Sequence, residues 1–338
     1  MKFILITGAT GFLGKHLVEQ LRRVEGSRLR VLCRGRAPWE QDSKAGSAPE
    51  AGEIEVIHGD ITSREDVLRA AEGMEEIYHL AGVVSRAPKD RRLLYRTHIE
   101  GTRNVCESAR RHGARKVVVV SSSGTIAVGR DPVAHNEESG YKHEIVGEWP
   151  YHLSKIFAEK VALSYARDNR LPVVVVNPSL LLGPGDDRQS STRDVALFLE
   201  GRILAIPLGG LNFVDARDAA SGLIAAMRAG RPGERYLLGG ANWTFRRLIA
   251  GLSKISGVRA PKVQPSLGFS LLSARLLRRV MPLIGKSFPL DDAEIKMSSL
   301  FWYCDCTKAR TELGFQTRDP METLNDTVED LRRRLPQD

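Results

Sequence analysis

The stretch that decides the fold is "KFILITGATGFLGKHLVEQL", residues 2–21. A run of apolar residues suited to a buried strand leads into Gly8, Gly11 and Gly14, and apolar residues at helical spacing follow. Glycines keep side chains away from the backbone N–H groups at the start of a helix, and such a helix start attracts anions. The stretch therefore predicts a strand, a phosphate-binding turn and a helix.

Strands and helices continue to alternate after this turn. Residues 117–120 and 173–176 are apolar at every position, which is typical of strands buried on both faces of a parallel sheet. Ser63, followed three residues later by Asp66, predicts the start of a helix that runs to Ala70 and beyond. We therefore expect an α/β fold with a doubly wound parallel sheet of the Rossmann type.

The end of the second strand bears on the choice of dinucleotide. An acidic residue about 20 residues after the glycine turn would hold the ribose 2′-hydroxyl of NAD, whereas an arginine suits the 2′-phosphate of NADP. Arg34 lies at that distance, and residues 32–36 contain no acid. The expected cofactor is NADP(H) rather than NAD(H); the alternative is that Arg34 and Arg36 belong to a solvated loop.

Strict alternation ends after residue 178, which predicts a second, smaller domain. We expect residues 1–178 to form the NADP-binding Rossmann domain and residues 179–338 to form mainly the substrate-binding domain. Residues 211–239 have the pattern of a strand and helix that return to the first domain, so the two domains would be interleaved.

Composition argues against several classes of protein. The 338 residues are 42% apolar without a run of about 18 apolar residues, so we expect no stable membrane insertion and a cytoplasmic location. The four cysteines form no C-x-x-C pair, and no metal site is predicted. The net charge of +9 is carried by scattered arginines without interleaved aromatic residues, so no nucleic-acid partner is expected.

A second motif, "WPYHLSKIFAEK" at residues 149–160, places Tyr151 and Lys155 four residues apart on one predicted helix face. Tyrosine has an unperturbed pKa of about 10, and a neighbouring lysine cation is expected to lower it. The hydroxyls of "SSSGT", residues 121–125, would end a central strand at the edge where such sheets bind ligands. Together these motifs predict a phenol that exchanges a proton with a substrate oxygen, although each alone also fits an ordinary helix or turn.

These motifs occur with others in a fixed order along nearly the whole chain: "HGDITS", "YHLAG", "NPS" at 177–179, "FVDARDAA" and "DCTKARTELGF". The chain resembles the extended short-chain dehydrogenase/reductases. Within them it is most similar to the dihydroflavonol-reductase-like branch, which includes hopanoid-associated sugar epimerases.

The resemblance implies a contact for each part of the cofactor. These are the amides of Phe12 and Leu13 with the pyrophosphate, Asp60 and Ile61 with adenine, Ala81 and Gly82 with the ribose next to nicotinamide, and Pro178 and Ser179 with the nicotinamide.

The resemblance also implies catalytic roles. Ser122 would polarise the substrate oxygen, with Ser123 a weaker candidate. Tyr151 would be the general acid and base, and Lys155 would also hold the nicotinamide ribose. His98 stands where the family commonly has an asparagine of a proposed proton relay; a histidine there could relay a proton or pack against the neighbouring helix.

The implied reaction is hydride transfer between the cofactor and a small-molecule carbonyl substrate. Sugar dehydratases of the superfamily usually show Thr-Asp-Glu where residues 122–124 are Ser-Ser-Gly, so water elimination is not expected. Two alternatives stay open: a nucleotide-sugar or other sugar epimerase with bound NAD(P), and a dinucleotide-binding sensor or structural subunit without catalysis.

Two further expectations concern surfaces. Residues 267–286 have an amphipathic pattern, either a lid helix that packs on its own domain or a wall for a hydrophobic substrate with brief membrane contact. The resemblance implies a homodimer through the helix at about residues 93–111 and the helix that begins at Tyr151.

Overall fold

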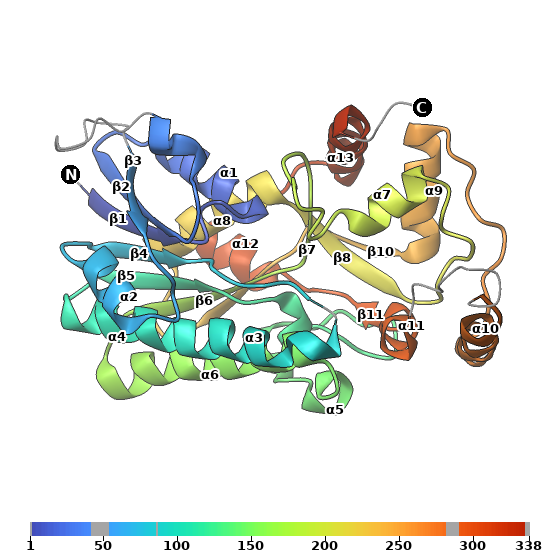
Figure 1. The fold of residues 1–338 in the computed structure, drawn as a ribbon, viewed down its shortest axis with the longest axis horizontal. Coiled ribbons are helices and arrows are strands. Elements are labelled where there is room, and N and C mark those ends of the chain that lie inside the picture. The colour runs from blue at the N-terminus through green and yellow to red at the C-terminus, as the bar shows by residue number, and fades with distance from the viewer. Residues whose placement is uncertain (1, 42–53, 86, 282–290, 335–338) are drawn as a thin grey trace.

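The computed structural model describes residues 2–41, 54–85, 87–281 and 291–334. Its larger sheet has seven parallel strands in the order β3-β2-β1-β4-β5-β6-β9 (Figure 1). These strands are β1 (Lys2–Thr7), β2 (Ser27–Cys33), β3 (Ile54–His58), β4 (Glu76–His79), β5 (Lys116–Val120), β6 (Val173–Pro178) and β9 (Arg235–Leu238). The predicted doubly wound parallel sheet is confirmed.

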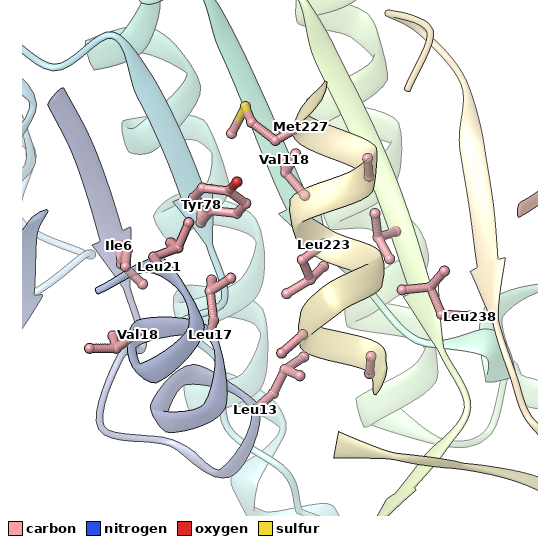
Figure 2. Close-up of a cluster of buried hydrophobic side chains, with 14 of the residues drawn as sticks. Ile6, Leu13, Leu17, Val18, Leu21, Tyr78, Val118, Leu223, Met227 and Leu238 are labelled. Atoms are coloured by element: carbon pink, nitrogen blue, oxygen red, sulfur yellow. The ribbon is translucent and has the colours of Figure 1, made fainter. Parts of the chain in front are cut away.

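Helices cover both faces of this sheet. One face carries α1 (Phe12–Leu21), α8 (Ala216–Ala229) and α12 (Thr307–Leu313), and the other carries α2 (Arg64–Ala71), α4 (Gly101–Arg111) and α6 (Pro150–Asn169). Successive strand residues point to opposite faces, so Val118 packs with the first group of helices and Val117 with the second. Figure 2 shows the first core, where Leu17 of α1 and Leu223 of α8 lie near Tyr78 of β4.

A smaller sheet has β8 (Gly210–Asp215) as its central strand. Strands β7 (Leu180–Leu182) and β11 (Phe301–Trp302) pair with β8 in parallel, and β10 (Ala241–Thr244) pairs with it antiparallel. Its core is built with α7 (Arg193–Leu199), α9 (Phe245–Ser256) and α13 (Pro320–Arg334).

The segment predicted to return to the larger sheet at residues 211–239 does so only in part. Residues 211–215 belong to β8 of the smaller sheet, because their pairing partners are β7, β10 and β11. The later part of the segment does belong to the larger sheet. Helix α8 packs against that sheet, and β9 is its outermost strand, next to β6. The division into two domains at residue 178 stays a prediction.

The remaining elements are short or lie at the periphery. They are α3 (Arg91–Tyr95), a π-helical turn (Arg96–Glu100), α5 (His143–Val146), α10 (Leu267–Val280), α11 (Asp292–Ser298) and the 3₁₀ turns Pro38–Gln41, Pro88–Asp90, Ser123–Thr125 and Glu137–Ser139. Helix α10 covers most of the amphipathic segment predicted at residues 267–286, of which residues 282–286 lie outside the described ranges. Every helix in the described ranges is too short or too polar to cross a bilayer.

Candidate active site

The predicted site residues follow the strands at one edge of the larger sheet. In sheet order, the chain places Asp60 after β3, Arg34 after β2, Gly8 after β1, Ala81 and Gly82 after β4, Ser122 after β5, and Pro178 at the end of β6, with Ser179 next to it. Parallel strands all end at the same edge, so one elongated ligand lying across that edge would pass these residues in turn.

The glycine turn has no room for side chains at two positions. Gly8 has φ +75°, and a Cβ there would lie 2.5 Å from the Ala81 nitrogen; at Gly14 a Cβ would lie 2.2 Å from the Gly8 carbonyl oxygen. Helix α1 begins at Phe12, and neither a capping side chain nor an acidic residue occupies its first turn. The amides of Phe12, Leu13 and Gly14 are therefore open to an anion, as a pyrophosphate requires.

The turn after β3 is fixed by its own side chains. Asp60 Oδ1 accepts hydrogen bonds from the Thr62 amide (2.8 Å) and the Thr62 hydroxyl (2.9 Å). The Ile61 side chain is 8% exposed and packs against Gly101 of α4, so only the backbone of Ile61 is available at this edge. Ser63 caps α2 by accepting from the Asp66 amide (3.3 Å), which confirms the predicted helix start.

Both a cation and a carboxylate lie near the end of β2. Arg34 is exposed and forms no ion pair with any described residue. Arg36 lies 3.7 Å from Glu40, whose carboxylate also accepts from the Ala37 amide (2.8 Å) and lies 3.3 Å from His58. The sequence analysis searched residues 32–36 for an acid and so did not include Glu40. The 3₁₀ turn Pro38–Gln41 brings Glu40 back toward the strand ends.

Tyr151 lies in the first turn of α6, which begins at Pro150. Its phenol lies beside the Ser122 side chain, whereas Ser123 is buried and lies beside Cys304. Burial raises the pKa of Tyr151, and the neighbouring Ser122 side chain lowers it in part. The expected lowering by Lys155 is thus wrong for this structure, in which desolvation dominates.

Lys155 points its ammonium at the ends of two strands rather than at the phenol. Nζ donates to the Val120 carbonyl oxygen (3.0 Å) at the end of β5, and a Cβ on Gly82 would lie 3.4 Å from it. The side chain is only 8% exposed, and this burial lowers the pKa of Lys155 to about 8. The cation lies beside Gly82, where the resemblance places the nicotinamide ribose.

His98 is held by hydrogen bonds on both ring nitrogens. It lies in the π-helical turn, a local widening often found at functional sites. Nε2 accepts from the Val83 amide (3.1 Å), so Nδ1 carries the hydrogen and donates to Ser154 Oγ (2.8 Å), which donates to the Tyr151 carbonyl oxygen (2.7 Å). Burial, with Lys155 nearby, lowers the pKa of His98 to about 2. In this arrangement His98 fixes the backbone around Tyr151 and has no ring nitrogen left for a proton relay.

Glu159 is a site residue that the sequence analysis missed. It is fully buried one turn after Lys155, and Oε1 accepts from Ser121 Oγ (2.5 Å), Thr125 Oγ1 (2.8 Å) and Asn177 Nδ2 (2.8 Å). Arg235 of β9 lies 3.6 Å from Oε2. The carboxylate thereby ties α6 to the ends of β5 and β6 and to the first residue of β9, and its charge raises the pKa of Lys155. The available signal was a glutamate four residues after Lys155 on the same buried helix face.

A cluster of aromatic rings, one of them from the smaller sheet, begins beside Tyr151. Trp302 of β11 stacks on His152 with ring centroids 5.0 Å apart, and His152 meets Tyr151 edge-on at 5.2 Å. Trp149 lies 6.0 Å from Trp302. A Cβ on Gly124 would lie 2.5 Å from the His152 ring, so the turn after Ser122 packs directly against these rings. The result is a packed aromatic cluster at the start of α6, in which Trp149 and His152 are buried and Trp302 is half-buried.

The geometry agrees with comparisons with known proteins. The profile described as "NAD dependent epimerase/dehydratase family" matches residues 4–239, well over half of the chain. The chain belongs to the NAD dependent epimerase/dehydratase family. The resemblance to extended short-chain dehydrogenase/reductases is thereby confirmed.

Two relatives of this family member match along almost the entire chain. "Putative dihydroflavonol 4-reductase" of Synechocystis sp. is 32% identical over 334 residues, covering 96% of this chain and 92% of its own. "Sterol demethylase protein B" of Methylococcus capsulatus is 32% identical over 336 residues, covering 98% of each chain. The predicted likeness to the dihydroflavonol-reductase-like branch is confirmed.

Solved structures show that this family member shares its fold along the whole chain. The crystal structure of gox2253 has a TM-score of 0.82 and 28% identity, covering 99% of both chains. The dTDP-glucose 4,6-dehydratase DesIV of Streptomyces venezuelae, solved with NAD and TYD bound, has a TM-score of 0.74 and 22% identity, covering 98% of this chain and 97% of its own. At that identity the likeness to DesIV shows the fold alone.

The lowered pKa of Lys155 predicts a pH-dependent stability. The folded pKa of about 8 lies below the ordinary 10.5, so the unfolded chain holds this proton more tightly between those two values. The free energy of unfolding of the native protein, relative to Lys155→Met, should therefore rise from pH 8 to 10.5, by as much as about 3 kcal/mol. Urea unfolding of both proteins across this range measures the difference.

Glu159→Gln supplies the matched test of this linkage. The carboxylate raises the pKa of Lys155, so its removal should move the start of the rise to a lower pH. Glu329→Gln, which removes an exposed carboxylate 3.7 Å from Arg333, should leave the profile unchanged. A stability difference between the native protein and Lys155→Met that stays flat with pH would show that Lys155 is not desolvated.

Proposed function

We propose that the chain reduces a ketone or aldehyde to an alcohol, with NADPH as the hydride donor. The observation that carries this proposal is the pair of neighbouring hydroxyls, Ser122 and Tyr151, at the end of β5, where the Lys155 ammonium binds the Val120 carbonyl oxygen. When bound, the nicotinamide supplies a hydride to the carbonyl carbon. The carbonyl oxygen then needs a proton, which this arrangement provides.

Each of the three side chains has a distinct task. Tyr151 gives its phenolic proton to the carbonyl oxygen, and its raised pKa keeps that proton in place at neutral pH. Ser122 donates a hydrogen bond to the same oxygen as negative charge develops there. Lys155 places a positive charge beside Gly82, where it would bind the ribose hydroxyls. The phenolate regains its proton from solvent.

Two features of the chain fit a bound dinucleotide. The uncapped start of α1 offers amides to the pyrophosphate. The Ser179 hydroxyl is buried and has no hydrogen-bond partner among the described residues, which leaves it available to the carboxamide of a nicotinamide next to Pro178. We assign the 2′-phosphate of NADP to Arg34, and adenine to Asp60 and the Ile61 backbone.

The proposed substrate is a hydrophobic carbonyl compound with rings. The aromatic cluster of Trp149, His152 and Trp302 next to Tyr151 supports it, because aromatic surroundings at the phenol suit a flat apolar molecule. The names of the two full-length relatives, which refer to a flavonol and to sterols, point the same way.

A sugar epimerase that recycles tightly bound NAD is the second candidate. Glu40 favours it, because a carboxylate near the end of β2 suits the ribose hydroxyls of NAD. Mass analysis of the native protein after purification separates the two functions: retained NAD(H) supports the epimerase, and an empty protein that takes up NADPH supports the reductase.

We also infer a homodimer through α3 and α6. Leu93 of α3 is 46% exposed and Phe157 of α6 is 38% exposed. The Phe157 ring lies 6.1 Å from that of the half-buried Tyr95, so apolar groups of α3 and α6 lie side by side. A light-scattering mass of one 37.4 kDa chain would contradict this inference.

Cofactor choice depends on Arg34. Arg34→Ala should weaken NADPH binding at least about tenfold and NADH binding little, because only NADPH carries the 2′-phosphate. Arg36→Ala is the matched control, since Arg36 already faces Glu40. Isothermal titration measures both affinities, and native protein that binds the two cofactors equally would contradict the assignment.

Turnover depends on Tyr151. Tyr151→Phe keeps the ring and removes the proton donor, so NADPH binding should survive while kcat falls roughly 10²-fold to 10⁴-fold. Ser122→Ala should lower kcat with little change in NADPH affinity, and Ser123→Ala should do much less, because Ser123 faces Cys304. NADPH oxidation over a panel of ring-containing ketones and aldehydes supplies the assay. If Tyr151→Phe reduced the substrate at the rate of the native protein, the proposed mechanism would be wrong.

A further inference from the structure

Helix α10 has an apolar stripe that the rest of the protein leaves exposed. Phe269, Leu272, Leu276 and Val280 are 63%, 67%, 63% and 45% exposed, and their spacing of three or four residues puts them on one side of the helix. On the opposite side Ala274 is buried. The stripe therefore does not pack on its own domain, as a closed lid helix would.

The position of α10 leaves this stripe accessible. Arg278 pairs with Asp292 of α11, and Arg275 lies 3.4 Å from the same carboxylate, so α11 contacts the side of α10 away from the stripe. Figure 1 shows α10 at the periphery, beyond the smaller sheet and next to α11. The stripe thus faces away from the helix that anchors α10.

The region around α10 carries the net charge of the whole chain. Residues 235–290 contain ten of the 50 lysines and arginines and none of the 41 acidic residues, so the remainder of the chain is almost neutral. The exposed cations in the described part of this region are Arg246, Arg247, Lys254, Arg259, Lys262, Arg275 and Arg279. The helix that carries the exposed apolar stripe therefore also carries the exposed cations Arg275 and Arg279, in a region of the sequence without acidic residues.

We propose that this surface docks the protein on an anionic lipid bilayer, with the stripe of α10 in the headgroup region and the cations at lipid phosphates. An amphipathic helix with basic flanks binds membrane surfaces in this way. The 14 residues of α10 span about 21 Å, less than the roughly 30 Å of a hydrocarbon core, so the helix lies in the plane of the surface.

Other occupants fit this surface less well. A second copy of α10 would bring the exposed Arg275 and Arg279 of both copies together, and these like charges would repel. A nucleic acid would meet the cations, but its phosphate backbone offers nothing to four exposed apolar side chains. Docking goes beyond the proposed reduction, and it would bring the substrate-binding part of the chain to the phase in which a hydrophobic carbonyl compound dissolves.

Vesicle flotation of the full chain tests this proposal. The native protein should float with phosphatidylcholine vesicles that contain phosphatidylglycerol and not with phosphatidylcholine alone, and salt should weaken the binding. The double variant Leu272→Gln with Leu276→Gln should lower the bound fraction at least about tenfold. The single variant Phe269→Gln should also lower the bound fraction. Lys262→Gln with Arg279→Gln should weaken binding mainly at low salt.

The matched control removes equally exposed apolar groups elsewhere. Val24→Gln with Val133→Gln changes side chains that are 45% and 57% exposed and should leave flotation unchanged. Thermal unfolding should be the same in all variants, because every changed side chain is exposed. Failure of the native protein to float, or native-level flotation of the double leucine variant, would overturn the proposal. A light-scattering mass that halves in that variant would assign the stripe to a second copy instead.

Discussion

At Gly8 the backbone of the first turn lies so close to Ala81 that no side chain fits between them. This approach joins the turn after β1 to the end of β4, and the equally tight contact at Gly14 presses α1 onto the same turn. The start of α1 is therefore held at the end of β4, next to Ala81, and the adjacent Gly82 lies close to Lys155. The proposed phosphate site and the proposed catalytic groups depend on this one constraint.

The carboxyl ends of the strands also hold two buried charged side chains, Lys155 and Glu159, and burial shifts their pKa values in opposite directions. Desolvation lowers the pKa of Lys155 and raises that of Glu159. Each charge is stabilised by the other and by polar groups from distant strands: Val120 for the ammonium, and Ser121, Asn177 and Arg235 for the carboxylate. Burying an ionised pair is unfavourable unless hydrogen bonds satisfy it, which explains why so many side chains converge on Glu159.

Local signals in the sequence were enough for the sheet, the glycine turn, the Ser63 cap and the Tyr151–Lys155 spacing, because each depends on neighbouring residues. What could not be predicted depends on residues far apart in the chain. Glu159 has no visible partner until β6 and β9 fold beside α6, and the raised pKa of Tyr151 follows from burial, which spacing does not reveal. The sheet to which residues 211–215 belong, and the exposure of the α10 stripe, likewise depend on tertiary packing.

In the proposed reaction, a nicotinamide bound at the strand ends gives a hydride to a carbonyl carbon while Tyr151 protonates the oxygen. Incubation with NADPH deuterated at C4 and a panel of ring-containing ketones and aldehydes, followed by mass spectrometry of the products, tests it most directly. The native protein should form an alcohol with deuterium on the carbinol carbon, and Tyr151→Phe should form at most a trace of it. Labelled alcohol formed equally well by Tyr151→Phe, or retained NAD(H) with no labelled alcohol from any substrate, would contradict the proposed reaction.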